Sequence, residues 1–360
     1  MRPLRLVESA IITASFAFAA SACSGGGSGA LSANAPPRAP FVRNISIAHA
    51  PKGGRAYELT EGRPWRSPGR IWASAFANDP SGSGFVNYYR LRGKDQPPLG
   101  QLSGALDGPE GMATDANGTL YVANTIDGNV LVYAPGATSP TKTLTDLKGW
   151  VPGELAIGAD GTLYVTNIHG PLPKKCGTFC IPKPGNIAVY ARGSDKPTAV
   201  YKTWPATQAY YPIGIGLDSK GDIFASYETS AVSGENASVI EFAAGAKTPT
   251  ETGIVLGYAG GITFDAKGHM LVGDLTCPCI DVFRRGSNIP SRQIVKTGTP
   301  VTFTFDSSGR DLYVANGANL DLEEYDYATD ALINSIEGGG FTETTQPTGI
   351  AIWPSLNAPK

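Results

Sequence analysis

A short motif recurs along most of this chain at a nearly constant spacing. The segment Gly118–Asn124 (GTLYVAN) returns as Gly161–Asn167 (GTLYVTN) and, with one inserted residue, as Gly309–Asn316 (GRDLYVAN). Weaker copies begin at Gly69, Gly221 and Gly268. A repeat of roughly 48 residues predicts an array of like units, and this interpretation takes precedence over any local assignment of strands and helices.

Each copy lies within a pattern of four short strands. An apolar strand and a D-x-x-G turn precede most copies, as at Asp115–Gly118, and Gly158 replaces the Asp in one of them. An alternating strand follows, as in Asn129–Gly136, and then a looser one, as in Lys142–Leu147. The Asp binds its own turn and Gly accepts a positive φ, so each turn indicates a hairpin. Four strands in each unit predict a propeller blade.

The two ends of the array complement each other. The unit at Gly69 lacks its own first strand, whereas the tail Thr348–Pro354 is a first strand with nothing after it. Pairing them removes the exposed edges of an open stack. We therefore predict an all-β fold, a six-bladed β-propeller over residues 69–354 closed by the C-terminal strand, with 355–360 as a tail.

The first 23 residues have the three regions of a secretory signal, and they resemble the leaders of bacterial lipoproteins. Either Cys23 is lipidated and becomes the mature N-terminus, or Ala20-Ser21-Ala22 is an ordinary cleavage site. Residues 24–68 are rich in Gly, Ser, Ala and Pro, which indicates a flexible tether. We expect a body in the cell envelope, anchored by lipid outside the cytoplasm, or otherwise secreted or periplasmic.

The charge balance limits the classes of partner that we expect for this chain. The chain has 29 Lys+Arg against 31 Asp+Glu, a net charge of −2, which does not favour nucleic acid. The apolar stretch at residues 10–20 is too short to span a membrane, so we expect membrane contact only through the lipid anchor. We expect a monomer, with an envelope protein or a glycan as partner.

The units resemble NHL-type repeats, and Tyr164–Asn167 spells the four letters that name the YVTN family of bacterial extracytoplasmic propellers. Either resemblance implies a propeller fold and a general habit of binding, because propellers host many unrelated activities.

In propellers, the loops into each first strand and those between the second and third strands share one face, here called the channel face. Among the segments leading into first strands, Glu110 and Glu154 are the two acids, and they lie on neighbouring blades. The pair would hold a hard cation such as Ca²⁺. Alternatively the carboxylates are solvated or paired with Lys. No other cofactor is expected.

Gluconolactonase-type propellers hold a catalytic metal with Glu and with Asn or Asp from several first-strand segments, and these Asn and Asp are missing here. A second ring of polar residues ends the second strands, either facing a ligand or binding local backbone: Asn124, Asn167, Tyr227, Asp274 and Asn316.

The sequence contains no G-x-S-x-G, H-E-x-x-H or P-loop motif. His49 lies in the tether, His169 opens a long insert, and His269 follows a turn opposite the channel face. We therefore expect a binding or interaction module more than an enzyme. The alternative is a metal-dependent hydrolase or lyase of the lactonase type, with Glu110 and Glu154 as ligands.

The third unit contains an insert over residues 168–185 that should project over the channel face, and we expect specificity in it and in residues 228–237. Lys174, Lys175 and Phe179 give the insert a basic, partly apolar tip. Cys176 and Cys180 lie in the insert, and Cys277 and Cys279 in the matching loop two blades on. An even number outside the cytoplasm favours disulfides, local or between blades, while metal thiolates or free thiols stay open.

Overall fold

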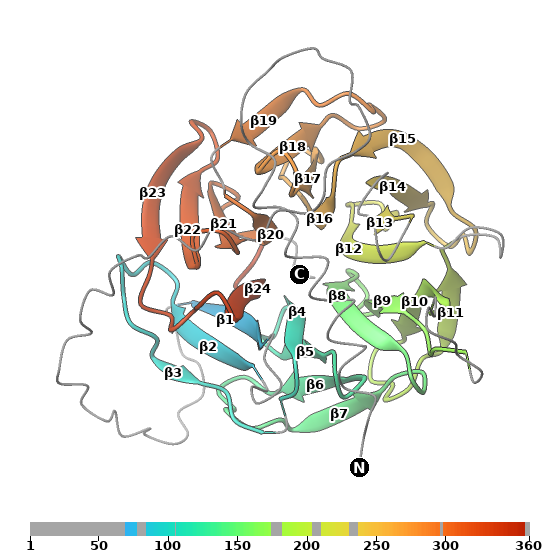
Figure 1. Cartoon of the computed structure of the whole chain (residues 1–360), viewed down its shortest axis with the longest axis horizontal. Helices are drawn as coiled ribbons and strands as arrows, with labels where there is room; N and C mark the ends of the chain where they lie inside the picture. Colours follow the sequence, from blue (N-terminus) through green and yellow to red (C-terminus); the bar gives the residue numbers. More distant parts are fainter. Residues whose placement is uncertain are drawn as a thin grey trace, which may run out of the picture.

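The computed structural model describes residues 69–77, 84–104, 106–173, 182–203, 210–229, 237–295 and 298–356. Six antiparallel sheets of four strands stand in a ring (Figure 1). The predicted all-β six-bladed propeller is confirmed. Within these ranges no helix is long and apolar enough to cross a membrane.

Apart from the red tail strand β24, the first three blades occupy the blue-to-green part of the ring (Figure 1). From the channel outward, blade 1 contains β24 (Thr345–Trp353), β1 (Arg70–Ala77), β2 (Phe85–Arg90) and β3 (Gly100–Gln101). Blade 2 contains β4 (Pro109–Thr114), β5 (Leu120–Asn124), β6 (Asn129–Tyr133) and β7 (Lys142–Thr145). Blade 3 contains β8 (Val151–Ile157), β9 (Leu163–His169), β10 (Pro184–Tyr190) and β11 (Ala199–Lys202).

The other three blades complete the ring in the same order. Blade 4 contains β12 (Tyr211–Leu217), β13 (Ile223–Glu228), β14 (Ala237–Phe242) and β15 (Thr250–Leu256). Blade 5 contains β16 (Ala259–Phe264), β17 (Met270–Asp274), β18 (Cys279–Phe283) and β19 (Arg292–Val295). Blade 6 contains β20 (Pro300–Phe305), β21 (Asp311–Asn316), β22 (Asp321–Asp326) and β23 (Ala331–Ile336).

The tail strand closes the ring as predicted. β24 pairs antiparallel with β1, from Arg70 opposite Trp353 to Ala77 opposite Thr345. Blade 1 is thus built from both ends of the propeller, so the last blade cannot separate from the first without breaking a sheet.

The core consists of layers between neighbouring blades, because each sheet buries both of its faces. One such layer joins Ile71 and Tyr89 of blade 1 to Tyr313 of blade 6, and comparable clusters fill the other five gaps. This arrangement explains why β1 is buried along nearly its whole length instead of at alternate residues.

Hydroxyl groups join the blades near the channel. The third residue of the recurring YVTN-type segment is a hydroxyl residue in three blades, and it donates to a carbonyl on the inner strand of the next blade. The bonds run from Ser74 to Glu110 (2.5 Å), from Thr166 to Ile213 (3.3 Å) and from Ser226 to Gly260 (2.6 Å).

Candidate functional site

The inner strand of every blade carries a β-bulge near its channel-face end. The register shifts lie between Pro109 and Met112, Pro152 and Leu155, Pro212 and Ile215, Ala259 and Ile262, Pro300 and Thr302, and opposite Ser74 and Ala75 in the β24–β1 pair. A bulge leaves its extra residue unpaired and re-aims the side chain, and bulges gather beside functional sites. Glu110 and Glu154 lie in two neighbouring bulges.

Glu110 is a buried carboxyl, with 8% of its surface exposed. Burial raises the pKa of Glu110 to about 8, against a smaller lowering by a hydrogen bond with the Thr125 side chain. A carboxyl in this state is mostly protonated at neutral pH, so it can donate a hydrogen bond. The simpler expectation of a solvated surface carboxylate does not hold for Glu110.

Glu154 lies beside Glu110 and keeps part of its surface open to the channel. A Cβ at Gly111 would stand only 2.8 Å from Glu154 Oε2, so the glycine lets the two bulges approach closely. Burial in the narrow channel wall raises the pKa of Glu154 to about 8, the like charge of Glu110 adds to this, and the Leu155 amide opposes it.

The channel beside Glu154 contains a cavity of about 110 Å³, enough for several water molecules. All six inner strands line it, and each turns its unpaired edge toward it. Leu155, Ile215 and Ile262 supply apolar surface, and Thr263 and Thr304 add polar side chains. The site therefore offers one partly open carboxyl in a mixed apolar and polar wall.

This pair alone is a sparse metal site. Across the described ranges, no three His, Cys, Asp or Glu side chains gather so as to hold a metal ion. Ca²⁺ prefers six to eight oxygen ligands, so here most would come from backbone carbonyls or water. When protonated, the Glu154 carboxyl that lines the cavity can instead exchange hydrogen bonds with a neutral polar ligand.

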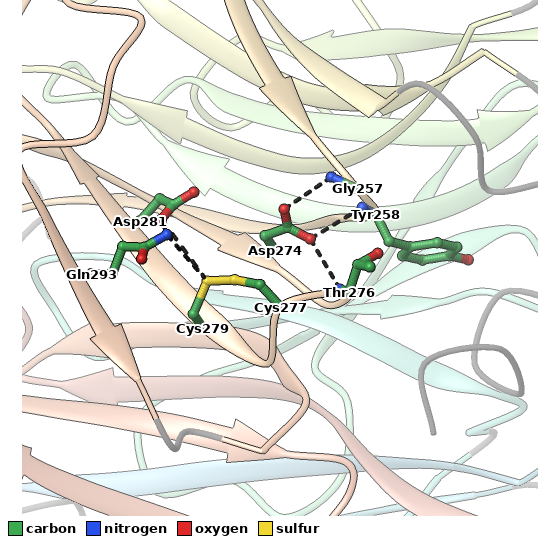
Figure 2. The surroundings of a disulfide bond; sticks show 8 residues. All are labelled: Gly257, Tyr258, Asp274, Thr276, Cys277, Cys279, Asp281 and Gln293. Atoms are coloured by element: carbon green, nitrogen blue, oxygen red, sulfur yellow. Dashed lines mark hydrogen bonds between the residues drawn. A yellow bond between two sulfur atoms is a disulfide. The ribbon is translucent and has the colours of Figure 1, made fainter. Parts of the chain in front are cut away.

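Three residues of the predicted second-strand ring bind backbone amides of the loop leading into their own blade. Asn124 Oδ1 accepts from Asp107 N (2.6 Å), and Asn316 Oδ1 accepts from Thr299 N (3.1 Å). The Asp274 carboxylate accepts from the amides of Gly257 (2.9 Å), Tyr258 (3.2 Å) and Thr276 (2.9 Å), as Figure 2 shows. These contacts are of the local structural kind, and they hold two channel-face loops together in each blade.

The other two ring residues are also buried and bonded within their blades. Asn167 Nδ2 donates to Asn186 Oδ1 (2.9 Å), and the Tyr227 hydroxyl donates to Glu251 (2.8 Å). Three ring residues therefore support channel-face loops and two bind side chains of other strands in their own blades, and a contact with a ligand stays a prediction.

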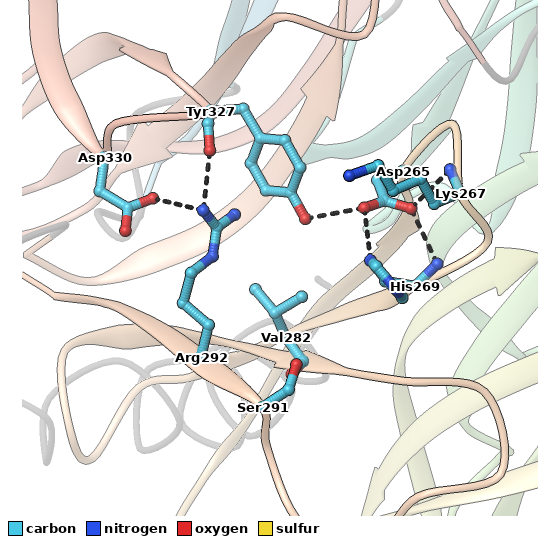
Figure 3. Close-up of polar contacts among 8 residues, drawn as sticks. All are labelled: Asp265, Lys267, His269, Val282, Ser291, Arg292, Tyr327 and Asp330. Carbon is cyan, nitrogen blue, oxygen red and sulfur yellow. Dashed lines mark hydrogen bonds and ion pairs between the residues drawn. The ribbon is translucent and has the colours of Figure 1, made fainter.

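The histidines of the described ranges have structural partners. His169 is buried at the end of β9, with Nδ1 3.0 Å from the Gly170 carbonyl oxygen. His269 Nδ1 lies 2.8 Å from Asp265 Oδ2, in a turn between the first and second strands of blade 5 (Figure 3). His49 lies outside the described residues.

Several other predicted site residues also lie outside the described ranges: Cys23, Lys174, Lys175, Cys176, Phe179 and Cys180. Cys277 and Cys279 are described, and a disulfide joins them in the turn between β17 and β18. The local pairing and the pairing between blades were both open from the sequence, and for these two residues the structure has the local pair.

A further buried glutamate near the channel-face end was missed by the sequence interpretation. Glu228, at the end of β13, is 3% exposed, and its Oε1 has no hydrogen-bond partner. Burial raises the pKa of Glu228 to about 8, and a hydrogen bond with the Tyr258 side chain of the next blade lowers it by a smaller amount. Across the β12–β13 pair lies Tyr211, whose enclosed hydroxyl also lacks a hydrogen-bond partner. No spacing in the sequence signalled this group, since its burial depends on a neighbouring blade.

No family model and no curated protein matches the chain. Among solved structures it is similar to a chain of a nidogen/laminin complex, with a TM-score of 0.58, 15% identity, and coverage of 79% of this chain and 98% of that one. It is also similar to a protein of unknown function from Bacteroides caccae, with a TM-score of 0.56, 12% identity, and coverage of 79% and 99%.

At such identities these similarities show the fold alone. The class of protein that fold and topology define is the six-bladed β-propeller, and one of its structural neighbours occurs in a complex between proteins. The closer resemblances to NHL and YVTN repeats stay predictions.

Proposed function

We propose that this chain is a cell-envelope or secreted propeller that binds a partner on its channel face, with an envelope protein or a glycan as the partner class. The observation that carries the proposal is the Glu110–Glu154 pair, set in adjacent bulges, of which Glu154 lines a cavity to which all six blades contribute. Ligand sites are typically concave and combine apolar surface with a few placed polar groups. This cavity has a mixed lining, with Glu154 and threonine side chains among apolar ones.

The surrounding loops would give the site its specificity. The insert at residues 168–185, with Lys174, Lys175 and Phe179, suits an anionic glycan or an acidic protein surface. A lipid on Cys23 and the tether over residues 24–68 would hold the channel face near the membrane while leaving it free to turn. No contact among the described residues favours the lactonase-like alternative.

The proposal is tested by immobilising the protein and measuring its binding to an array of anionic and neutral glycans and to purified envelope proteins. We expect binding to at least one class. Replacing residues 171–183 with a short Gly-Ser link, or introducing Glu110→Gln with Glu154→Gln, should weaken this binding about tenfold or more, equivalent to roughly 1.4 kcal/mol.

Glu343→Gln is the matched control, because Glu343 is an exposed acid in the loop leading to β24. Repeating the assay in Ca²⁺ and in EDTA shows whether a cation takes part. Absence of binding by the unmodified protein, or equal binding by both altered proteins, would contradict the proposal.

A further inference from the structure

The turn between β17 and β18 carries a disulfide between residues only two apart in sequence. Cys277 and Cys279 enclose Pro278, with their Cα atoms 5.3 Å apart (Figure 2). A cross-link that closes so short a loop removes little conformational freedom from the unfolded chain. Its contribution to the stability of the propeller is therefore small.

The turn is also held without the sulfurs. The Asp274 carboxylate accepts hydrogen bonds from three backbone amides, those of Gly257, Tyr258 and Thr276. Opening the disulfide would leave this anchor intact. The Asp274 hydrogen bonds therefore hold the turn whether the disulfide is closed or open.

The two sulfurs have unequal surroundings. Cys277 is exposed at the tip of the turn, while Cys279 is 1% exposed at the start of β18. An external thiolate can reach only the outer residue, so attack is directed to Cys277, and Cys279 becomes the leaving sulfur.

Two polar side chains lie near the buried sulfur of Cys279. Asp281 Oδ1 lies 3.9 Å and Gln293 Nε2 lies 4.0 Å from Cys279 Sγ (Figure 2). Gln293 also donates to Asp281 Oδ1 at 2.8 Å, which fixes the carboxyl in place. The amide N–H can stabilise a thiolate on Cys279, and the Asp281 oxygen can accept from its thiol once protonated. These neighbours suit a sulfur that is released and recaptured.

We propose that Cys277 and Cys279 form a thiol-exchange site on the channel face. The thiolate of an external thiol attacks Cys277 Sγ, forms a mixed disulfide there and breaks the bond to Cys279, whose sulfur leaves with the electron pair and takes a proton from solvent. A second external thiolate then attacks the outer sulfur of the mixed disulfide. Two external thiols become one disulfide as the protein gains two thiols, and the reverse sequence restores the cross-link.

The test uses the full chain with Cys23, Cys176 and Cys180 replaced by Ser, so that only the pair remains. The protein is equilibrated in glutathione buffers of graded oxidised-to-reduced ratio, quenched in acid, and its thiols are counted by maleimide mass tagging. We expect the pair to pass from disulfide to dithiol within this range while tryptophan fluorescence stays that of the folded protein.

Direction of attack is tested with single cysteines. With oxidised glutathione, Cys279→Ser should form an adduct on Cys277 at least about tenfold faster than Cys277→Ser forms one on Cys279. Replacing glutathione with a purified dithiol protein at equal thiol concentration distinguishes a small-molecule source from a protein one. A pair that stays oxidised in fully reduced glutathione, that never oxidises, or that forms both adducts equally fast overturns the proposal.

Discussion

At the scale of single residues, three glutamates near the channel-face end of the propeller share a raised pKa: the buried Glu110 and Glu228 and the partly exposed Glu154. Burial raises the pKa of Glu110, Glu154 and Glu228 to about 8 each, against about 4.3 for an unperturbed glutamate. Between these values the native state binds more protons than the unfolded state. The free energy of unfolding therefore falls as the pH rises through this window, and the stability is greatest on its acid side.

Glu228→Gln should remove the contribution of Glu228 to the pH dependence of the free energy of unfolding. From about pH 5 to about pH 8, the unfolding free energy of the unmodified protein should fall more steeply than that of the variant, by at most about 1.4 kcal/mol per pH unit. Urea denaturation at a series of pH values measures both slopes. Glu343→Gln, at an exposed position, should leave the slope unchanged, and parallel curves for Glu228→Gln would contradict a neutral, buried Glu228.

The sequence located Glu110 and Glu154 because each follows a proline that leads into a first strand. Their burial was not predictable, since it depends on bulges that bring Gly111 against Glu154 across a blade boundary. In the same way, the five polar residues near the ends of second strands were found by repeat position, but their partners, loop amides for three and side chains for two, required the folded blades.

At the scale of elements, the D-x-x-G turns connect neighbouring blades as well as their own strands. In three blades the turn Asp contacts a residue of the following blade that lies just after the third strand of that blade. Arg285 pairs with Asp218 (2.8 Å), Arg92 pairs with Asp306 (3.4 Å), and the Tyr327 hydroxyl donates to Asp265 (3.0 Å).

The packing of Tyr327 shows how such a contact is held in place. Arg292 lies 4.4 Å from the centre of the Tyr327 ring, donates to the Tyr327 carbonyl (2.9 Å) and pairs with Asp330 (3.3 Å), as Figure 3 shows. Where Gly158 replaces the turn Asp, the matching residue of the next blade is Ala244. At this boundary, therefore, neither side chain of such a contact is present.

Arg285→Ala should therefore destabilise the protein more than Arg284→Ala. Both arginines are exposed neighbours in one turn, but Arg285 also contacts Asp222 (3.0 Å), and its loss leaves the buried Asp218 without this cation. We expect a loss of about 1 kcal/mol for Arg285→Ala and less than about 0.5 kcal/mol for Arg284→Ala. Urea denaturation gives both values, and equal losses would remove Arg285 from the role of an inter-blade contact.

At the scale of the whole molecule, the ring was predictable because short sequence segments reveal its repeat period, its turns and its incomplete first and last units. The terminal strand Thr345–Trp353 and the first strand Arg70–Ala77 complete one blade as expected. The six bulges were not predicted, because a bulge is defined by the register of two strands and not by one strand alone. They decide which side chains reach the channel, so the site was less predictable than the fold.

Closure is the claim on which every placement around the channel depends, and amide hydrogen exchange tests it most directly. If β24 and β1 complete one sheet, their amides should exchange with opening free energies within about 1 kcal/mol of those in β5 and β13. Mass spectrometry of peptides covering residues 70–77 and 345–353 measures this. Exchange of the 345–353 peptide at the rate of an unstructured chain, while the central strands stay protected, would contradict a ring closed by its tail.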